Sequence, residues 1–177
     1  GEKLFPDFIN LHTDPFDPRM PALPWTSSRL PMRPIGWIEN GAVKNLAYSR
    51  YWAEKTGKSA TPSPDPLYLD GGGASLDDLI ASVERGLLVT HFWYIRFVNP
   101  KTLQHTGLTR DGLFLIENGK IAAPVMNFRF NESPVRLLQN ARKLSKPVRV
   151  RGLEGGMMVA PAILAGDFHF TSISDAV

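Results

Sequence analysis

Proline constrains this chain more than any other residue type. The sequence has 15 Pro and 15 Gly among 177 residues, and proline is densest in PFDPRMPALPWTSSRLPMRP, residues 15–34. Because proline cannot donate a backbone N–H and breaks helix interiors, this content favours short strands and turns over a helical bundle. We therefore expect the first part of the chain, to about Pro34, to be an extended segment that crosses the surface of the rest.

The remaining composition is that of one globular domain, which we expect to cover residues 1–177. The chain has no cysteine, which excludes disulfides, thiolate zinc sites and a cysteine nucleophile. No apolar run is long enough to span a membrane and no signal peptide opens the chain, so we expect a cytoplasmic location without membrane contact. A net charge of +3 is only mildly basic and makes a nucleic-acid partner unlikely.

Two copies of the tetrapeptide IENG predict two β-hairpins. They stand at residues 38–41, in PIGWIENGAVKNLAYS, and at residues 116–119, in GLFLIENGKIAAPVMNF. The Asn-Gly pair supplies the positive φ angles of a type I′ turn, and apolar residues flank both copies. The repeat hints at a duplicated unit, although four letters are weak evidence for one.

Three short helices are expected between the strands. SLDDLIASVERG has Ser75 as N-cap, Asp78 in a capping box and Gly86 to close the helix. SPVRLLQNARKL opens with Ser133 and a proline at the first helical position, and SRYWAEKTG runs from Ser49 to Gly57. The other apolar runs predict strands at residues 87–98, 148–151, 157–164 and in DFHFTSI. The fold class predicted is α+β, a mostly antiparallel β-sheet or barrel-like body with about three short helices.

The stretch GLLVTHFWYIRFVNP, residues 86–100, has the strongest binding signal. As a regular strand it would direct Thr90, Phe92, Tyr94 and Arg96 to one side. Aromatic rings beside a cation are typical of a surface that contacts another chain, so we predict these four residues as substrate-binding residues. The alternative is a strand face covered by the neighbouring strands of its own hairpin.

Other candidate sites carry weaker signals. LYLDGGGAS, residues 67–75, leads into a helix but matches no phosphate-binding glycine motif, so a flexible loop is the simpler interpretation. His12, His91, His105 and His169 lack the spacing of a zinc helix, and we predict neither metal ligands nor catalytic residues in this chain. The basic run ARKLSKPVRVRG, residues 141–152, is interpreted as a solvated helix end and strand, with an anion-binding face as the alternative.

A longer string gives the chain a family resemblance. RGLLVTHFWYIRFVNPKTLQHTGLTRDGLFLIENGKIAAPVMNFRFNES, with TRDG followed by IENG, resembles the C-terminal part of the TldD/PmbA family. This family is also called modulator of DNA gyrase and is classed among zinc metallopeptidases. The segments LFPDFINLHTDPFDPRMPALPW, RPIGWIENGAVKNLAYSRYWAEKTG and GLEGGMMVAPAILAGDFHFTS extend the likeness over nearly the whole chain.

The resemblance implies a β-rich domain of a two-part protein that cleaves unfolded peptides and works as a homo- or heterodimer with a family member. In that family an N-terminal half carries an H-E-x-x-x-H zinc helix, and the catalytic type adds a cysteine ligand from the C-terminal half. This chain has neither, so the resemblance implies a domain that is inert alone, with no cofactor of its own and zinc only in the full-length protein. The alternative is a non-catalytic interaction subunit of the PmbA/TldE kind, or a parent in which His169 or Asp167 replaces the thiolate.

Overall fold

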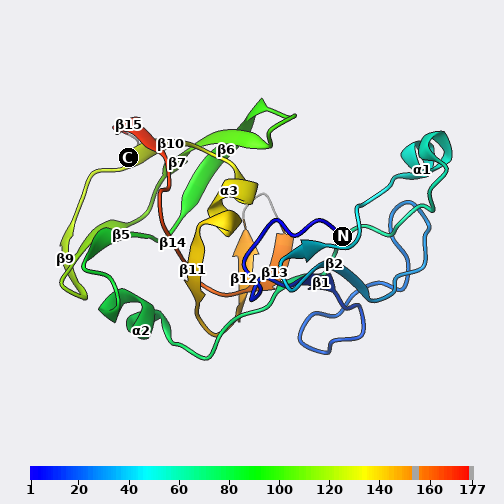
Figure 1. Ribbon diagram of the computed structural model, residues 1–177, viewed down its shortest axis with the longest axis horizontal. Helices are drawn as coiled ribbons and strands as arrows, with labels where there is room; N and C mark the ends of the chain where they lie inside the picture. Colours follow the sequence, from blue (N-terminus) through cyan, green and yellow to red (C-terminus); the bar gives the residue numbers. More distant parts are fainter. Residues whose placement is uncertain (153–155, 176–177) are drawn as a thin grey trace. The chain divides into compact units, whose positions relative to one another are not determined.

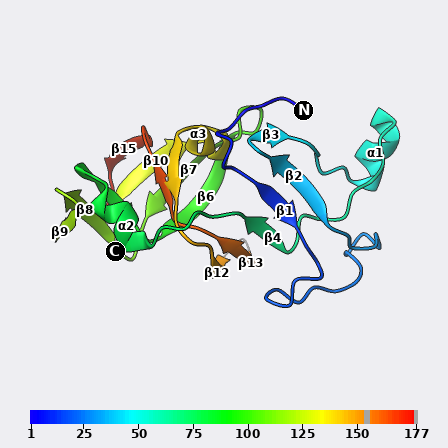
Figure 2. The same cartoon turned by 60° about the horizontal axis from the view of Figure 1, so that its bottom comes forward.

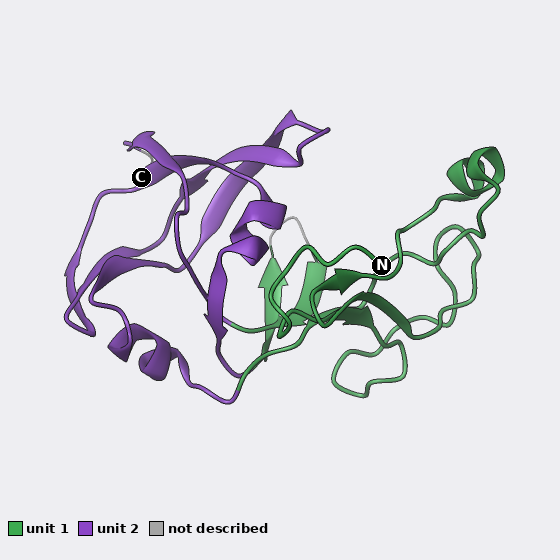
Figure 3. Ribbon diagram, in the orientation of Figure 1, with its two compact units in different colours: residues 1–72, 147–161 green, residues 73–146, 162–177 purple. Residues whose placement is uncertain are grey.

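The computed structural model describes residues 1–152 and 156–175, and these form two compact units (Figure 3). Unit 1 contains residues 1–72 and 147–161, and unit 2 contains residues 73–146 and 162–177. Each unit therefore combines segments that are distant in sequence. The predicted α+β class is confirmed, with mostly antiparallel sheets and three helices among the described residues; none of these sheets closes into a barrel.

Unit 1 is built on a six-stranded sheet. In spatial order its strands are β12 (Val148–Gly152), β13 (Gly156–Ala160), β4 (Leu67–Leu69), β1 (Leu11–Thr13), β2 (Ile35–Glu39) and β3 (Ala42–Val43). β13 and β4 pair in parallel, and the other neighbours are antiparallel. Figure 2 shows β1 between β2 and β4. The expected surface course of the first segment is therefore wrong for Leu11–Thr13, which lie inside the sheet, whereas residues 15–34 form no strand.

The buried side chains of unit 1 come from both of its segments. Met20, Tyr68 and Val159 form one apolar cluster. In the same unit, the Trp37 Nε1–H donates to the Thr13 hydroxyl at 2.9 Å. Both residues are buried, so this bond gives each polar group a partner. Helix α1 (Arg50–Thr56) begins after Ser49 and ends at a left-handed Gly57, as predicted.

Unit 2 contains three separate sheets. The first has the order β15 (Phe170–Ile173), β10 (Phe128–Glu132), β7 (Gln104–Thr109), β6 (Phe92–Asn99). The second has the order β5 (Arg85–Val89), β8 (Leu113–Glu117), β9 (Lys120–Pro124), and the third pairs β11 (Ala141–Leu144) with β14 (Ile163–Ala165).

Both predicted Asn-Gly hairpins are confirmed, because Asn40, Gly41, Asn118 and Gly119 have φ angles of 50°, 75°, 50° and 75°.

Two predicted helices are shorter than the sequence pattern suggests. α2 (Leu76–Ala81) has the predicted capping box but ends at Ser82, and Gly86 lies instead within β5. α3 (Pro134–Gln139) starts at Ser133 and Pro134 as expected, but Ala141–Leu144 continue as strand β11. In both cases pairing with a distant strand overrides helix propensity.

Two predicted strands are each divided. The run at residues 87–98 splits into β5 and β6, which belong to different sheets, with Thr90 and His91 between them. The run at residues 157–164 splits at Pro161 into β13 of unit 1 and β14 of unit 2. In the described part of the chain, no helix has the length and apolar character to cross a bilayer.

Candidate functional site

A hollow of about 920 Å³ lies within unit 2 between strands β5 and β14. We call it the β5–β14 groove. Helix α2 supplies part of its wall, and Figure 1 shows α2 near the start of β5. Its apolar lining includes Leu79, Ile80, Leu87, Val89, Ile163 and Phe168. The groove therefore combines apolar side chains with the backbone of two strands.

The groove side of β5 is an open strand edge. Among the described residues, β5 pairs with β8 alone. Two hydrogen bonds fix which residues face β8: Thr90 N–H to Gly112 O at 3.2 Å and Asn118 N–H to Glu84 O at 2.7 Å. Because pairing alternates along an antiparallel strand, the even-numbered residues of β5 bond β8. The N–H and C=O groups of Arg85, Leu87 and Val89 therefore point to the opposite side.

β14 presents a second open edge. In the part of the chain that the structure describes, it pairs with β11 alone. Ser145 N–H donates to Ala162 O at 3.0 Å, and Gly166 N–H donates to Asn140 O at 3.1 Å. The same alternation leaves the backbone groups of Ile163 and Ala165 directed away from β11. Residues of both strands line the groove, so unpaired backbone donors and acceptors border it on two sides.

Aromatic rings join the far ends of these two strands. Phe92 follows β5 and Phe168 follows β14, and their rings stack with centroids 5.3 Å apart. Phe130 contacts both rings, at 5.1 Å from Phe92 and 5.4 Å from Phe168. Because Phe92 and Phe168 each come after the C-terminal end of a strand, β5 and β14 both lead toward this stack.

Four charged residues line the groove. Glu84 and Arg85 stand at the start of β5, Arg142 lies on β11, and Asp167 follows β14. The guanidinium of Arg142 lies against Gly166, where a Cβ atom would be 2.5 Å from Nη2. A side chain at position 166 would therefore displace this cation.

Helix α2 is fixed beside the groove by its cap. The Asp78 carboxylate accepts hydrogen bonds from the Ser75 N–H and the Ser75 hydroxyl, each at 2.8 Å. These bonds favour the charged form and hold the pKa of Asp78 below its usual value of 3.8. The cap thus orients Leu79 and Ile80 toward the core, where both are buried.

The four predicted substrate-binding residues do not share one strand face. Thr90 lies between β5 and β6, and its hydroxyl donates to Gly112 O at 2.8 Å. The pairing of β6 with β7 shifts between Trp93 and Arg96, and Tyr94 has a φ angle of 54°, so a bulge interrupts the alternation. Of the four, Phe92 alone lines the groove.

Beyond the bulge, Tyr94 and Arg96 form a pair on the edge strand β6. The Arg96 guanidinium carbon lies 4.4 Å from the Tyr94 ring centroid, a cation–π geometry, and Tyr94 is 53% exposed. Ile95 and Phe97 of the same strand are also exposed. The sequence interpretation missed Arg142, Ile163 and Ala165, since no motif marks an edge strand that becomes open only in the folded sheet.

The described residues hold no cluster of three or more metal-ligating side chains. His91 Nδ1 pairs with Asp111 at 2.7 Å, and His169 Nδ1 contacts the Asn131 carbonyl at 3.2 Å. The resemblance would place the cysteine ligand of the catalytic type near Gly152 to Gly156, and residues 153–155 of this region lie outside the described residues. The described side chains do not fit a zinc ion.

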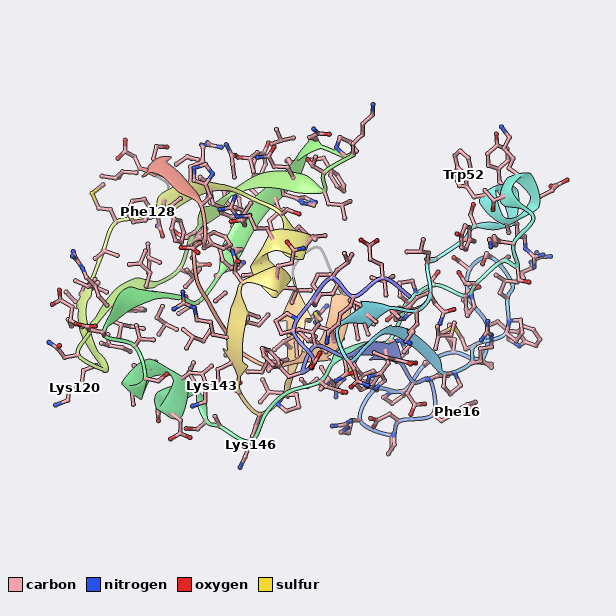
Figure 4. The ribbon with its side chains drawn as sticks, viewed as in Figure 1. Phe16, Trp52, Lys120, Phe128, Lys143 and Lys146 are labelled. Atoms are coloured by element: carbon pink, nitrogen blue, oxygen red, sulfur yellow. The ribbon has the colours of Figure 1, made fainter. Side chains whose placement is uncertain are left out.

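The basic run at residues 141–152 is distributed over both units. Its first part is strand β11, not the predicted helix end, and its last part is the predicted strand, β12. Lys143 and Lys146 of unit 2, labelled in Figure 4, contribute to lowering the pKa of Asp78 and do not line the groove. The run does not form one basic face within a single unit.

These features define a domain of mainly antiparallel sheets in which two open strand edges border an apolar groove. Residues 1–172 match the family model of the PmbA/TldA metallopeptidase C-terminal domain. The chain therefore belongs to the TldD/PmbA family, as a C-terminal domain.

Solved structures agree with this assignment. The chain is similar to TldE from Thermococcus kodakarensis, with 26% identity and a TM-score of 0.77 over 98% of this chain and 41% of that chain. A Bacteroides thetaiotaomicron protein assigned as a modulator of DNA gyrase shares the fold, with a TM-score of 0.82, 24% identity and 97% and 38% coverage. This chain thus spans about two-fifths of these relatives. No curated protein matches it.

Proposed function

We propose that this chain is the peptide-holding domain of a TldD/PmbA-type protein. An extended, unfolded peptide enters the β5–β14 groove and pairs as an added strand with an open edge. The observation that carries the proposal is the pairing of the described strands, which directs the backbone groups of Arg85, Leu87 and Val89 away from β8 and those of Ile163 and Ala165 away from β11. Added strands gain affinity from main-chain hydrogen bonds, and neighbouring apolar pockets hold alternate side chains.

Of the predicted substrate-binding residues, Phe92 has a direct role in this proposal. Its ring contributes to the end wall of the groove. Thr90 does not line the groove. Its hydroxyl donates to Gly112 O and so holds the short segment between β5 and β6 in place. A folded substrate cannot offer a free strand, which is why unfolded peptides fit such an edge.

Peptide hydrolysis, in this proposal, belongs to the full-length family member and not to this chain. The sequence has no cysteine, and the described residues do not fit zinc. Zinc bound by another half would supply the activated water there. The 177-residue chain alone should hydrolyse no peptide and bind no stoichiometric zinc, as measured by peptide chromatography and metal analysis of the purified chain.

A second role is contact with a family member, in a homodimer or heterodimer. The relevant feature is β6, an edge strand with the exposed Tyr94–Arg96 pair and exposed Phe97. Similarity to TldE favours the variant in which this chain is a non-catalytic subunit of the TldE kind. The edges that hold the peptide belong to β5 and β14, whereas the partner would contact β6 from Tyr94 onward, so one chain can do both.

Backbone methylation tests the strand-addition proposal directly. Short apolar peptides are N-methylated at every second residue, in two sets that differ by one position. Strand addition predicts that one set loses binding to the chain and the other keeps most of it, because N–H groups alternate toward the paired edge. Calorimetry on both sets measures this; equal affinity of the two sets would contradict the proposal.

A further inference from the structure

We infer that the β5–β14 groove selects the free C-terminal carboxylate of its peptide, and that Arg142 binds this group. The inference rests on the proposed function, because it concerns the same groove. It assigns a direction to the bound peptide and a recognition residue to one end.

Aromatic rings line the groove where β5 and β14 end. Phe92 and Phe168 stack at 5.3 Å between the ends of β5 and β14, and Phe130 packs against both. A peptide that lies along either strand edge cannot continue through a ring stack. The end of the groove beside these rings therefore accommodates a chain terminus more readily than the middle of a peptide.

Arg142 provides a cation in this part of the groove. Its strand β11 pairs with β14, and its guanidinium lies against Gly166, the residue that follows β14. Among the described residues, no carboxylate forms an ion pair with it. A guanidinium offers two parallel N–H groups that match the two oxygens of a carboxylate, and a peptide C-terminus presents that group.

The other charges do not by themselves choose between the two peptide termini. Glu84 and Arg85 stand at the start of β5, and Asp167 lines the groove next to Gly166. The net charge of these four residues is zero and favours neither terminus, so the position of Arg142 decides which terminus binds. Arg142 is held against Gly166, between β14 and the ring stack, which places a cation at the end of the groove beside the rings. A peptide whose carboxylate meets Arg142 then runs parallel to β5 and β14.

The test compares four forms of one short apolar peptide, with free or acetylated N-terminus and free or amidated C-terminus. Calorimetry with the whole 177-residue chain should show about five- to ten-fold weaker binding on amidation and little change on acetylation. Arg142→Gln should abolish the difference between acid and amide. Lys143→Gln is the matched control, because Lys143 is the next residue of β11 and does not line the groove.

Each alternative has a distinct result. Equal affinity of acid and amide in the wild-type chain overturns the inference without any variant, and the proposed function still stands if one N-methylated set loses binding. Weaker binding on acetylation would show that the groove selects an ammonium group. An amidated peptide with an internal aspartate that binds as tightly as the free acid would show that a side-chain carboxylate is the ligand.

Discussion

At the scale of single residues, the cap of α2 shows how few atoms fix the wall of the groove. Ser75 and Asp78 exchange three hydrogen bonds, because the Asp78 N–H also donates to the Ser75 hydroxyl at 3.0 Å. The two bonds that reach the carboxylate favour its ionised form and lower its pKa. The charge also lies at the helix N-terminus, where the helix dipole favours an anion.

Removal of this carboxylate should change the pH dependence of stability. A group whose folded pKa is lowered stabilises the protein above its unfolded pKa and loses this effect as pH falls through the folded value. Asp78→Asn should therefore lower Tm at pH 7, and the difference from wild type should shrink below about pH 4. Ser75→Ala should cost about 1 kcal/mol. Thermal melts from pH 7 to pH 3 measure both.

Asp77→Asn is the control, since Asp77 lies in the same first turn without a bond to the cap among the described contacts. A Tm difference for Asp78→Asn that stayed constant down to pH 3 would contradict the role of the carboxylate.

At the scale of elements, β6 is the strand most suited to meet another chain. It borders its sheet, it spans Phe92–Asn99, and its bulge at Tyr94 prevents a regular alternation of buried and exposed residues. Five of its large apolar side chains are exposed: Phe92, Tyr94, Ile95, Phe97 and Val98. An edge strand of this length with apolar side chains associates with other strands unless something covers it.

Truncation of the Tyr94 ring should weaken association through β6. Tyrosine is enriched among interface residues that dominate binding energy, so Tyr94→Ala should raise the dissociation constant of the dimer by about ten-fold or more. Arg96→Ala, which removes the cation over that ring, should act in the same direction. Sedimentation over a concentration series measures the change for the chain alone and for a mixture with a family member.

Ile121→Ala is the matched control, because Ile121 is 51% exposed on β9, close to the 53% of Tyr94 on β6. If both β6 variants associate as the wild type does, the partner surface lies elsewhere.

At the scale of the whole molecule, neither unit is one continuous stretch of chain. The chain passes from one unit to the other after residues 72, 146 and 161. Unit 1 needs its second segment, because β13 pairs in parallel with β4 and Val159 packs against Met20 and Tyr68. Val159 is only 4% exposed, so its removal would open the core of the unit.

A fragment of residues 1–72 should therefore fail to fold on its own. Loss of two strands and of Val159 removes more than the roughly 2–5 kcal/mol of a single large core truncation, against a total stability of about 5–15 kcal/mol. Circular dichroism and thermal melting should show no cooperative transition. A fragment that unfolded cooperatively, at a Tm like that of the full chain, would show that residues 147–161 are dispensable for unit 1.

The sequence by itself determined the local features, because each depends on neighbouring residues. Both Asn-Gly hairpins form as predicted, since only a few residue types accept positive φ at two successive positions. All three helices begin at their predicted serine caps, whose side-chain oxygens accept from the backbone N–H groups of the first turn.

Only the tertiary structure decided where strands end and which edges stay open. The apolar run from Leu87 to Val98 reads as one strand, yet its two halves pair with β8 and β7 in different sheets, and the bulge at Tyr94 reverses the alternation on which the predicted face depended. Arg142 reaches the groove because β11 pairs with β14, a strand from a much later part of the chain. Pairing between distant strands is set by the packing of the whole sheet, and no local pattern of residues encodes it.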